Sequence, residues 1–205
     1  MNQRQHTELT TALKTIVKLE KELKRPLLYN LGYRELLQAQ EVRGFYSNFK
    51  RIKGAGGADA ESKNYKRIEA KSKKSKINSQ TGKYNWKIGF EFDKQNDPIR
   101  RQQTLQYDSF FFTVFSGENE LPLVSAIAKD PKAVQSIKNV LKKEQGKFVK
   151  RLQEATKKGK RIGRDSVKVE LKDLFGIQNI IWVINQKKVS LSDAQKLFGY
   201  KKLDN

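Results

Sequence analysis

Apolar residues along this chain recur at helical spacing in some stretches and at every second position in others. Spacings of three and four residues predict helices, because such residues share one face, whereas alternation predicts a strand with one covered face. We predict helices at 7–24, 33–49, 98–107, 131–159 and 192–198. Strands are predicted at 84–92, 110–115, 167–171 and 179–184, of which 110–115 is apolar on both faces.

Proline and aspartate mark the predicted helix ends. Pro26 stops the first helix, and the pairs Asp97-Pro98 and Asp130-Pro131 suit an N-cap followed by a first helical position. A half-exposed strand, a crossing helix and a buried strand in succession predict an α/β fold, with a mixed central β-sheet flanked by helices. We expect a single domain over 1–205, with a helical part (about 1–50), a core (about 51–130) and a basic helical and strand part (131–205).

The charge balance points to a polyanionic partner. The 205 residues contain 43 Lys and Arg against 22 Asp and Glu, a formal net charge of +21. Two windows concentrate this charge, since 50–76 holds ten basic residues and three acids, and 138–172 holds thirteen and four. No apolar run approaches the roughly 18 residues that a membrane span needs, so we expect double-stranded DNA as the partner and no membrane.

Several kinds of site are excluded by composition. The chain has no cysteine and one histidine, His6, so it cannot form a thiolate zinc site, a histidine metal cluster or a Ser-His-Asp triad. The first ten residues lack the apolar segment of a secretory signal, which predicts a cytoplasmic protein.

The candidate chemistry lies in the segment 56–71. Two glycines precede Asp59, turn-forming residues follow, and 65–71 can form the second strand of a hairpin. Residues two apart on a strand share a face, so Glu69 and Lys71 project together, and Asp59 can face them from the neighbouring strand. Two carboxylates beside an amine can hold Mg²⁺ next to a water molecule.

Two other Glu-x-Lys triplets are weaker candidates. The triplet that begins at Glu22 lies in a predicted helix, where residues two apart do not share a face. The triplet that begins at Glu170 belongs to an amphipathic strand whose apolar face is Val167, Val169 and Leu171, so Glu170 and Lys172 are expected on the solvated side.

The Asp59, Glu69 and Lys71 pattern resembles the signature of the PD-(D/E)xK nuclease superfamily, and within it the type II restriction endonucleases. The resemblance covers about 30–115, with Ala58 where the family usually has proline. It implies that Asp59, Glu69 and the Ala70 carbonyl bind Mg²⁺ and that Lys71 orients the attacking water.

A further acid in that family often comes from the preceding helix, and the resemblance suggests Glu41 for this role. Glu41 interrupts an otherwise apolar helical stripe, although a glutamate at the edge of the buried face reaching out to solvent explains it too. Glu35 and Glu61 are substitutes for it.

The resemblance implies a restriction-endonuclease-like core and a Mg²⁺-dependent, sequence-specific endodeoxyribonuclease, a hydrolase of a restriction system that acts as a homodimer on palindromic DNA. The alternatives are a structure-specific or repair nuclease of the same superfamily and a non-enzymatic basic nucleic-acid-binding protein.

We expect DNA contacts from basic and amide side chains near the hairpin and in the C-terminal part. Phosphate contacts come from Lys and Arg, and base contacts from side chains that reach the base edges. The candidates are Lys73, Lys74, Lys76, Asn85, Lys87, Arg161 and Arg164. Gln103 and Tyr107 also match a Gln-x-x-x-Tyr motif of the exonuclease branch, but we assign them no catalytic role.

Overall fold

A computed structural model describes residues 7, 8, 11, 12, 14, 15, 30–52, 58–118, 121–163 and 165–200. Its helices are α2 (Asn30–Arg43), α3 (Pro98–Thr104), α4 (Pro131–Lys157), α5 (Leu171–Phe175) and α6 (Leu191–Phe198). Its strands are β1 (Lys50–Arg51), β2 (Ala60–Glu61), β3 (Ile68–Ser75), β4 (Gly89–Phe92), β5 (Ser109–Ser116), β6 (Pro122–Ala128), β7 (Val167–Glu170), β8 (Ile181–Ile184) and β9 (Lys187–Val189).

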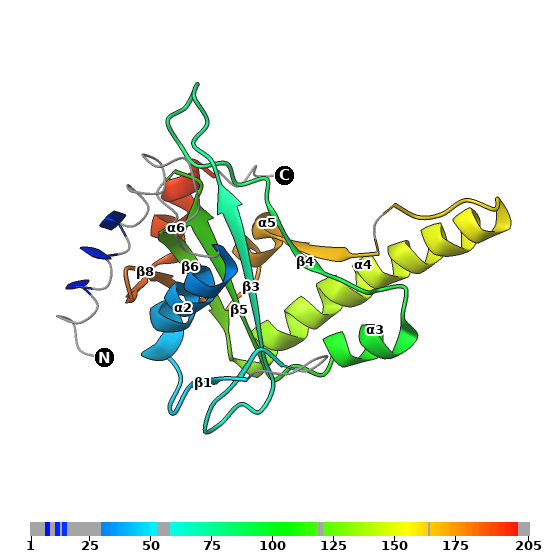
Figure 1. The fold of residues 1–205 in the computed structure, drawn as a ribbon, viewed down its shortest axis with the longest axis horizontal. Coiled ribbons are helices and arrows are strands. Elements are labelled where there is room, and N and C mark those ends of the chain that lie inside the picture. Colours follow the sequence, from blue (N-terminus) through cyan, green and yellow to red (C-terminus); the bar gives the residue numbers. More distant parts are fainter. Residues whose placement is uncertain are drawn as a thin grey trace.

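Seven of these strands form one mixed sheet in the order β1-β2-β3-β5-β6-β8-β9 (Figure 1). Strands β3 and β5 are parallel along their whole length, and the other neighbouring pairs of this sheet are antiparallel. The segment between β3 and β5 contains β4 and α3, and β4 pairs with β7 in a separate two-stranded sheet. The predicted α/β class with a mixed central sheet is confirmed.

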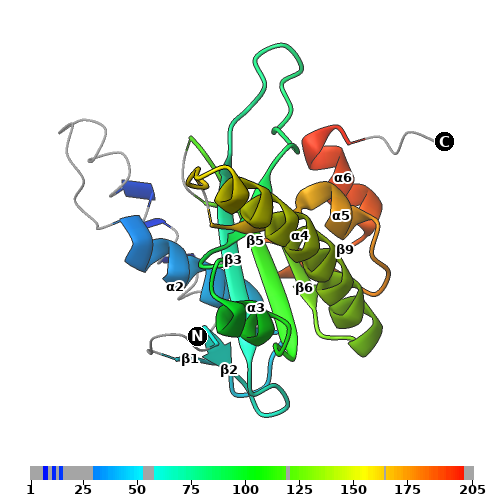
Figure 2. The same ribbon diagram turned by 90° about the vertical axis from the view of Figure 1, so that its right-hand side faces the viewer.

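Strand β5 lies at the centre because its side chains are apolar on both faces. All eight of its residues are buried. Phe110 and Phe112 pack on the side of α4. Phe111 points to the opposite face, where it packs with Val42 of α2 and with Tyr46, which follows this helix. Burying each phenylalanine contributes about 1.5–3 kcal/mol. The sheet is therefore covered on both faces, by α2 on one and by α4 on the other (Figures 1 and 2).

Helix α4 begins and ends as its sequence predicts. The Asp130 carboxylate accepts hydrogen bonds from the backbone N–H groups of Lys132 and Ala133, and Pro131 occupies the first turn. The helix ends before Gly159, whose φ of 62° suits glycine. Its apolar stripe packs on the sheet side that also carries β4 and β7.

Some predicted elements differ from those observed. Residues 84–92 form a strand only over β4. Tyr84 makes an isolated antiparallel bridge with Ile77, and the rings of Tyr84 and Trp86 pack on Phe198 and Tyr200. Strand β3 continues to Ser75, four residues beyond the predicted end, since it pairs with β5 throughout. The predicted first helix is described at six positions, all helical and exposed, and its apolar face lies outside the described residues.

Candidate active site

Asp59 lies where β2 and β3 separate. Its backbone N–H donates to the Ile68 carbonyl at 2.9 Å, and its carbonyl accepts from Ile52 N at 3.0 Å. Beyond this point the Asp59 side chain takes the place of a strand partner, because its Oδ2 accepts a hydrogen bond from Ala70 N at 2.9 Å. The carboxylate is therefore held beside β3 from both its backbone and its side chain. The predicted hairpin is present, with Ala60 opposite Ile68.

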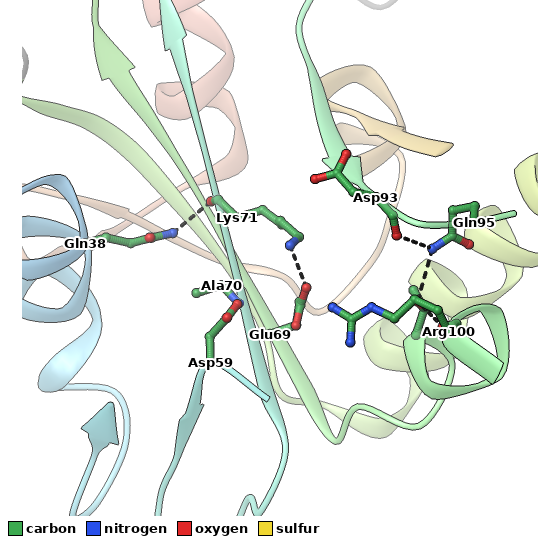
Figure 3. A network of polar contacts seen from close by, with 9 residues as sticks. Gln38, Asp59, Glu69, Ala70, Lys71, Asp93, Gln95 and Arg100 are labelled. Carbon is green, nitrogen blue, oxygen red and sulfur yellow. Dashed lines mark hydrogen bonds and ion pairs between the residues drawn. The ribbon is translucent and has the colours of Figure 1, made fainter. Parts of the chain in front are cut away.

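Glu69 and Lys71 lie two residues apart on β3 and form an ion pair (Figure 3). Lys71 Nζ is 2.7 Å from Glu69 Oε1, and it also lies 5.2 Å from the ring centroid of Phe92. Glu69 is only 2% exposed. The pair is thus formed in a setting with little water, where electrostatic interactions are stronger than at the surface.

Burial governs the electrostatics of this site. Removal of water raises the pKa of Glu69 above its ordinary 4.5, the charge of Lys71 opposes this rise, and the nearby Asp59 carboxylate adds to it. The two carboxylates are therefore close enough to repel each other, as like charges in one site do. Within the described part of the chain, the other oxygen of Glu69, Oε2, is buried and makes no hydrogen bond of ordinary geometry, although the Tyr107 hydroxyl lies close enough to lower the pKa of Glu69 by hydrogen bonding. Such an atom fits a cation as its partner.

Tyr107 and Arg100 complete the surroundings of Glu69, and neither was predicted to be a site residue. Tyr107 is buried, and burial together with the Glu69 charge raises the pKa of its phenol, whereas Arg100 lowers it. Figure 3 shows the Arg100 guanidinium directed towards Glu69 from α3. The sequence contained a signal for Tyr107, the Gln-x-x-x-Tyr spacing. Arg100 had none, because no sequence spacing relates it to Glu69 and only the folded arrangement brings its side chain near (Figure 3).

The resemblance suggested Glu41 as a further metal ligand, but its side chain is engaged elsewhere. Its Oε1 accepts a hydrogen bond from Gln186 N at 3.0 Å, in the turn between β8 and β9. Burial raises the pKa of Glu41, and the backbone N–H groups of Gln186 and Asn185 oppose the rise. The interruption of the apolar stripe therefore reflects a carboxylate that caps a turn at the other side of the sheet.

The other acid of α2 is Glu35. It forms an ion pair with Arg51 at 3.1 Å, and both line a small cavity that Asp59 and Ala70 also line. Gln38 fixes α2 against β3 through a 2.8 Å hydrogen bond from its Nε2 to the Lys71 carbonyl (Figure 3). The other predicted substitute, Glu61, pairs in register with Lys50 at the end of β2.

The predicted DNA-contacting residues are distributed over two regions. On β3, Lys73 forms an ion pair with Glu91 at 3.1 Å, Lys74 is half-buried and the following Lys76 is exposed. Asn85 Oδ1 accepts a hydrogen bond from Lys87 N, and Lys87 lies over the Trp86 ring. Arg161 is exposed beyond α4, and Arg164 lies outside the described residues.

The donors at Asp59 and Glu69 fit a magnesium ion. Among the described residues no group of three or more Asp, Glu, His or Cys side chains could form a metal cage. A cage is not what Mg²⁺ requires, because this ion is usually bound by one or two carboxylates while water and substrate phosphates supply the rest. Two carboxylates, one with a buried oxygen that makes no hydrogen bond of ordinary geometry, meet that requirement.

No protein-family model matches this chain, and no curated protein sequence matches it. Within its described residues, none of the helices has the length and apolar character that a membrane crossing demands.

Proposed function

We propose that this protein is a Mg²⁺-dependent, sequence-specific endodeoxyribonuclease of the type II restriction kind, built on a restriction-endonuclease-like core. The observation that carries the proposal is the meeting of Asp59 with the buried Glu69 and Lys71 pair at the point where β2 and β3 separate. The net charge of +21 suits a DNA substrate.

In this proposal Asp59, Glu69 and the Ala70 backbone would hold the ion, which supplies charge stabilisation to a phosphoryl group in transfer. Lys71 orients and polarises the water that attacks phosphorus, and its position is set by the 2.7 Å contact to Glu69. The new P–O bond forms as the ester bond opposite it breaks, which leaves a terminal phosphate and a free hydroxyl. Arg100, directed at the same place, can offset negative charge on the phosphate (Figure 3).

A plasmid digest tests the proposal. Supercoiled plasmid is incubated with the protein in Mg²⁺ or in EDTA, and the products are separated on a gel. We expect discrete fragments in Mg²⁺ and intact plasmid in EDTA. A smear would indicate a nuclease without sequence specificity, and intact DNA that is retarded under both conditions would indicate a binding protein that does not cut.

Asp59→Asn is the matched variant for this digest. The amide oxygen of asparagine can still accept the hydrogen bond from Ala70 N, so the hairpin is kept while the charge is removed. The proposal requires that Asp59→Asn bind DNA and fail to cut it. Cutting at the wild-type rate by this variant would contradict the assignment of Asp59.

A further inference from the structure

A cavity of about 200 Å³ lies between α2, the strands β1 and β3, and Asp59, the residue that precedes β2. It is lined by Arg34, Glu35, Gln38, Arg51, Asp59, Ala70, Lys71 and Ser72. Two guanidinium groups from different elements, one from α2 and one from β1, thus face the same small space as the candidate metal ligand Asp59.

Both guanidinium groups have capacity left for an acceptor. Arg34 Nε and Arg51 Nη1 are buried and have no hydrogen-bond partner in the described part of the chain. Arg51 uses only Nη2 for its ion pair with Glu35, whose side chain is 56% exposed. A buried N–H of a charged group without an acceptor costs free energy, so the arrangement favours an anionic ligand.

The size and chemistry of the cavity restrict that ligand. Its volume is below the roughly 300 Å³ at which pockets for whole small molecules begin, so a single ionic group fits better than a complete nucleotide. Guanidinium groups bind phosphate oxygens in a forked geometry, and they keep their charge when partly buried. A phosphodiester is therefore the group that suits the cavity.

We infer that Arg34 and Arg51 bind one backbone phosphate of the DNA strand next to the phosphate that is cut. The inference rests on the proposed function and adds to it a phosphate subsite beside Asp59. A phosphate held there fixes where the strand lies relative to Glu69 and Lys71. Glu35 competes for Arg51 in the free protein and yields it when the phosphate enters.

The salt dependence of DNA binding tests the subsite without any cleavage. The dissociation constant of a fluorescent duplex is measured by anisotropy in EDTA at several salt concentrations, for the wild type and for the double variant Arg34→Gln, Arg51→Gln. Loss of one phosphate contact makes the slope of the logarithm of the association constant against the logarithm of salt concentration less steep by about 0.9. We expect that decrease, and a loss of affinity of about tenfold or more.

A matched double variant removes two cations from the opposite edge of the sheet. Lys187→Gln, Lys188→Gln changes two exposed lysines of β9 and should leave the slope unchanged. Glu35→Gln should strengthen binding because it removes the competitor of Arg51. The double variant Arg34→Lys, Arg51→Lys should keep the slope because both charges remain. It should weaken binding because lysine lacks the paired hydrogen-bond donors of a guanidinium group. Circular dichroism checks that the variants fold.

The outcomes separate this inference from the proposed function. Equal slopes for the wild type and the arginine double variant would overturn the subsite, even if the protein cuts DNA. Failure of the wild type to bind the duplex would overturn it as well. A wild type that binds but does not cut in Mg²⁺ would contradict the proposed function, whereas a reduced slope of the arginine variant would still support the phosphate contact.

Discussion

Two Glu-x-Lys triplets in this protein have the same ion-pair distance and different surroundings. Lys71 Nζ and Glu69 Oε1 are 2.7 Å apart, and so are Lys172 Nζ and Glu170 Oε2. The side chain of Glu69 is 3% exposed, however, whereas that of Glu170 is 47% exposed. Burial raises the pKa of Glu69, while around the second pair the hydrogen bond and charge of Glu170 raise the pKa of Lys172.

The difference shows that the triplet by itself does not make a catalytic site. Glu170 ends β7, and its backbone N–H donates to Asp173 at the start of α5, so the exposed pair lies at a strand-to-helix junction in water. Exposed ion pairs of this kind contribute about 0–1 kcal/mol. Glu69 instead has a second carboxylate, that of Asp59, close enough to raise its pKa. A neighbouring acid in a dry setting is what distinguishes the candidate site.

The largest expected effect is on the cleavage rate, and it distinguishes the triplet at Glu69 from the triplet at Glu170. Glu69→Ala and Lys71→Ala should each lower the rate of Mg²⁺-dependent cleavage at saturating DNA by at least about 10²–10³-fold, because Glu69 would hold the metal ion and Lys71 orients the attacking water. Rates are measured with a labelled duplex, and filter binding checks that the variants still bind DNA.

Glu170→Ala and Lys172→Ala are the matched controls for that experiment. Both side chains line a groove of about 540 Å³ that also includes Lys143, Lys147 and Arg151. Lys172→Ala should therefore raise KM at most, with kcat within about twofold of the wild type. Equal losses of kcat from the two triplets would remove the distinction between them.

The sequence predicted the local chemistry of the hairpin better than the contacts made across the fold. Asp59, Glu69 and Lys71 could be placed together because strand geometry relates neighbours that are close in the chain. The same holds for the caps of α4 and for the apolar strand at 110–115. Glu41 was preferred to Glu35, but the sequence could not test this order, since the positions of both residues depend on how α2 crosses the sheet and on the turn that Gln186 forms.

A smaller effect is expected on the unfolding free energy when a buried carboxylate outside the candidate active site is changed. Glu41 is 4% exposed and burial raises its pKa, as for Glu69, but it caps a turn, and no lysine of the described residues forms an ion pair with it. A carboxyl whose pKa is raised by folding contributes stability below its unfolded pKa and loses it as the pH rises through the folded pKa. Glu41→Gln cannot titrate, so its unfolding free energy relative to the wild type should increase from below pH 4.5 to neutral pH.

Urea denaturation at several pH values measures this difference, and cleavage assays accompany it. We expect Glu41→Gln to cut DNA within about twofold of the wild type, since it touches neither Asp59 nor Glu69. A difference in unfolding free energy that stays constant with pH would contradict the role given to Glu41. Loss of cleavage in a folded variant would return Glu41 to the site.

The extents of β3 and β4 were the hardest to predict. The alternation at 84–92 arises from rings that pack on Phe198 and Tyr200, and alternation alone does not show whether a strand partner exists. The lysines of β3 were expected to follow the strand, yet hydrogen bonding to β5 extends it through them. In both cases a long-range neighbour decides the local structure.

Binding of Mn²⁺, followed by electron paramagnetic resonance, tests most directly whether the triplet that begins at Glu69 forms a metal site with Asp59. Mn²⁺ takes oxygen ligands as Mg²⁺ does and is directly observable. The wild type and Glu170→Gln should each bind Mn²⁺ at this site, and Glu69→Gln and Asp59→Asn should bind it at least about tenfold more weakly, since even outer-shell changes cost that much. Equal Mn²⁺ affinity in all four proteins would contradict the account.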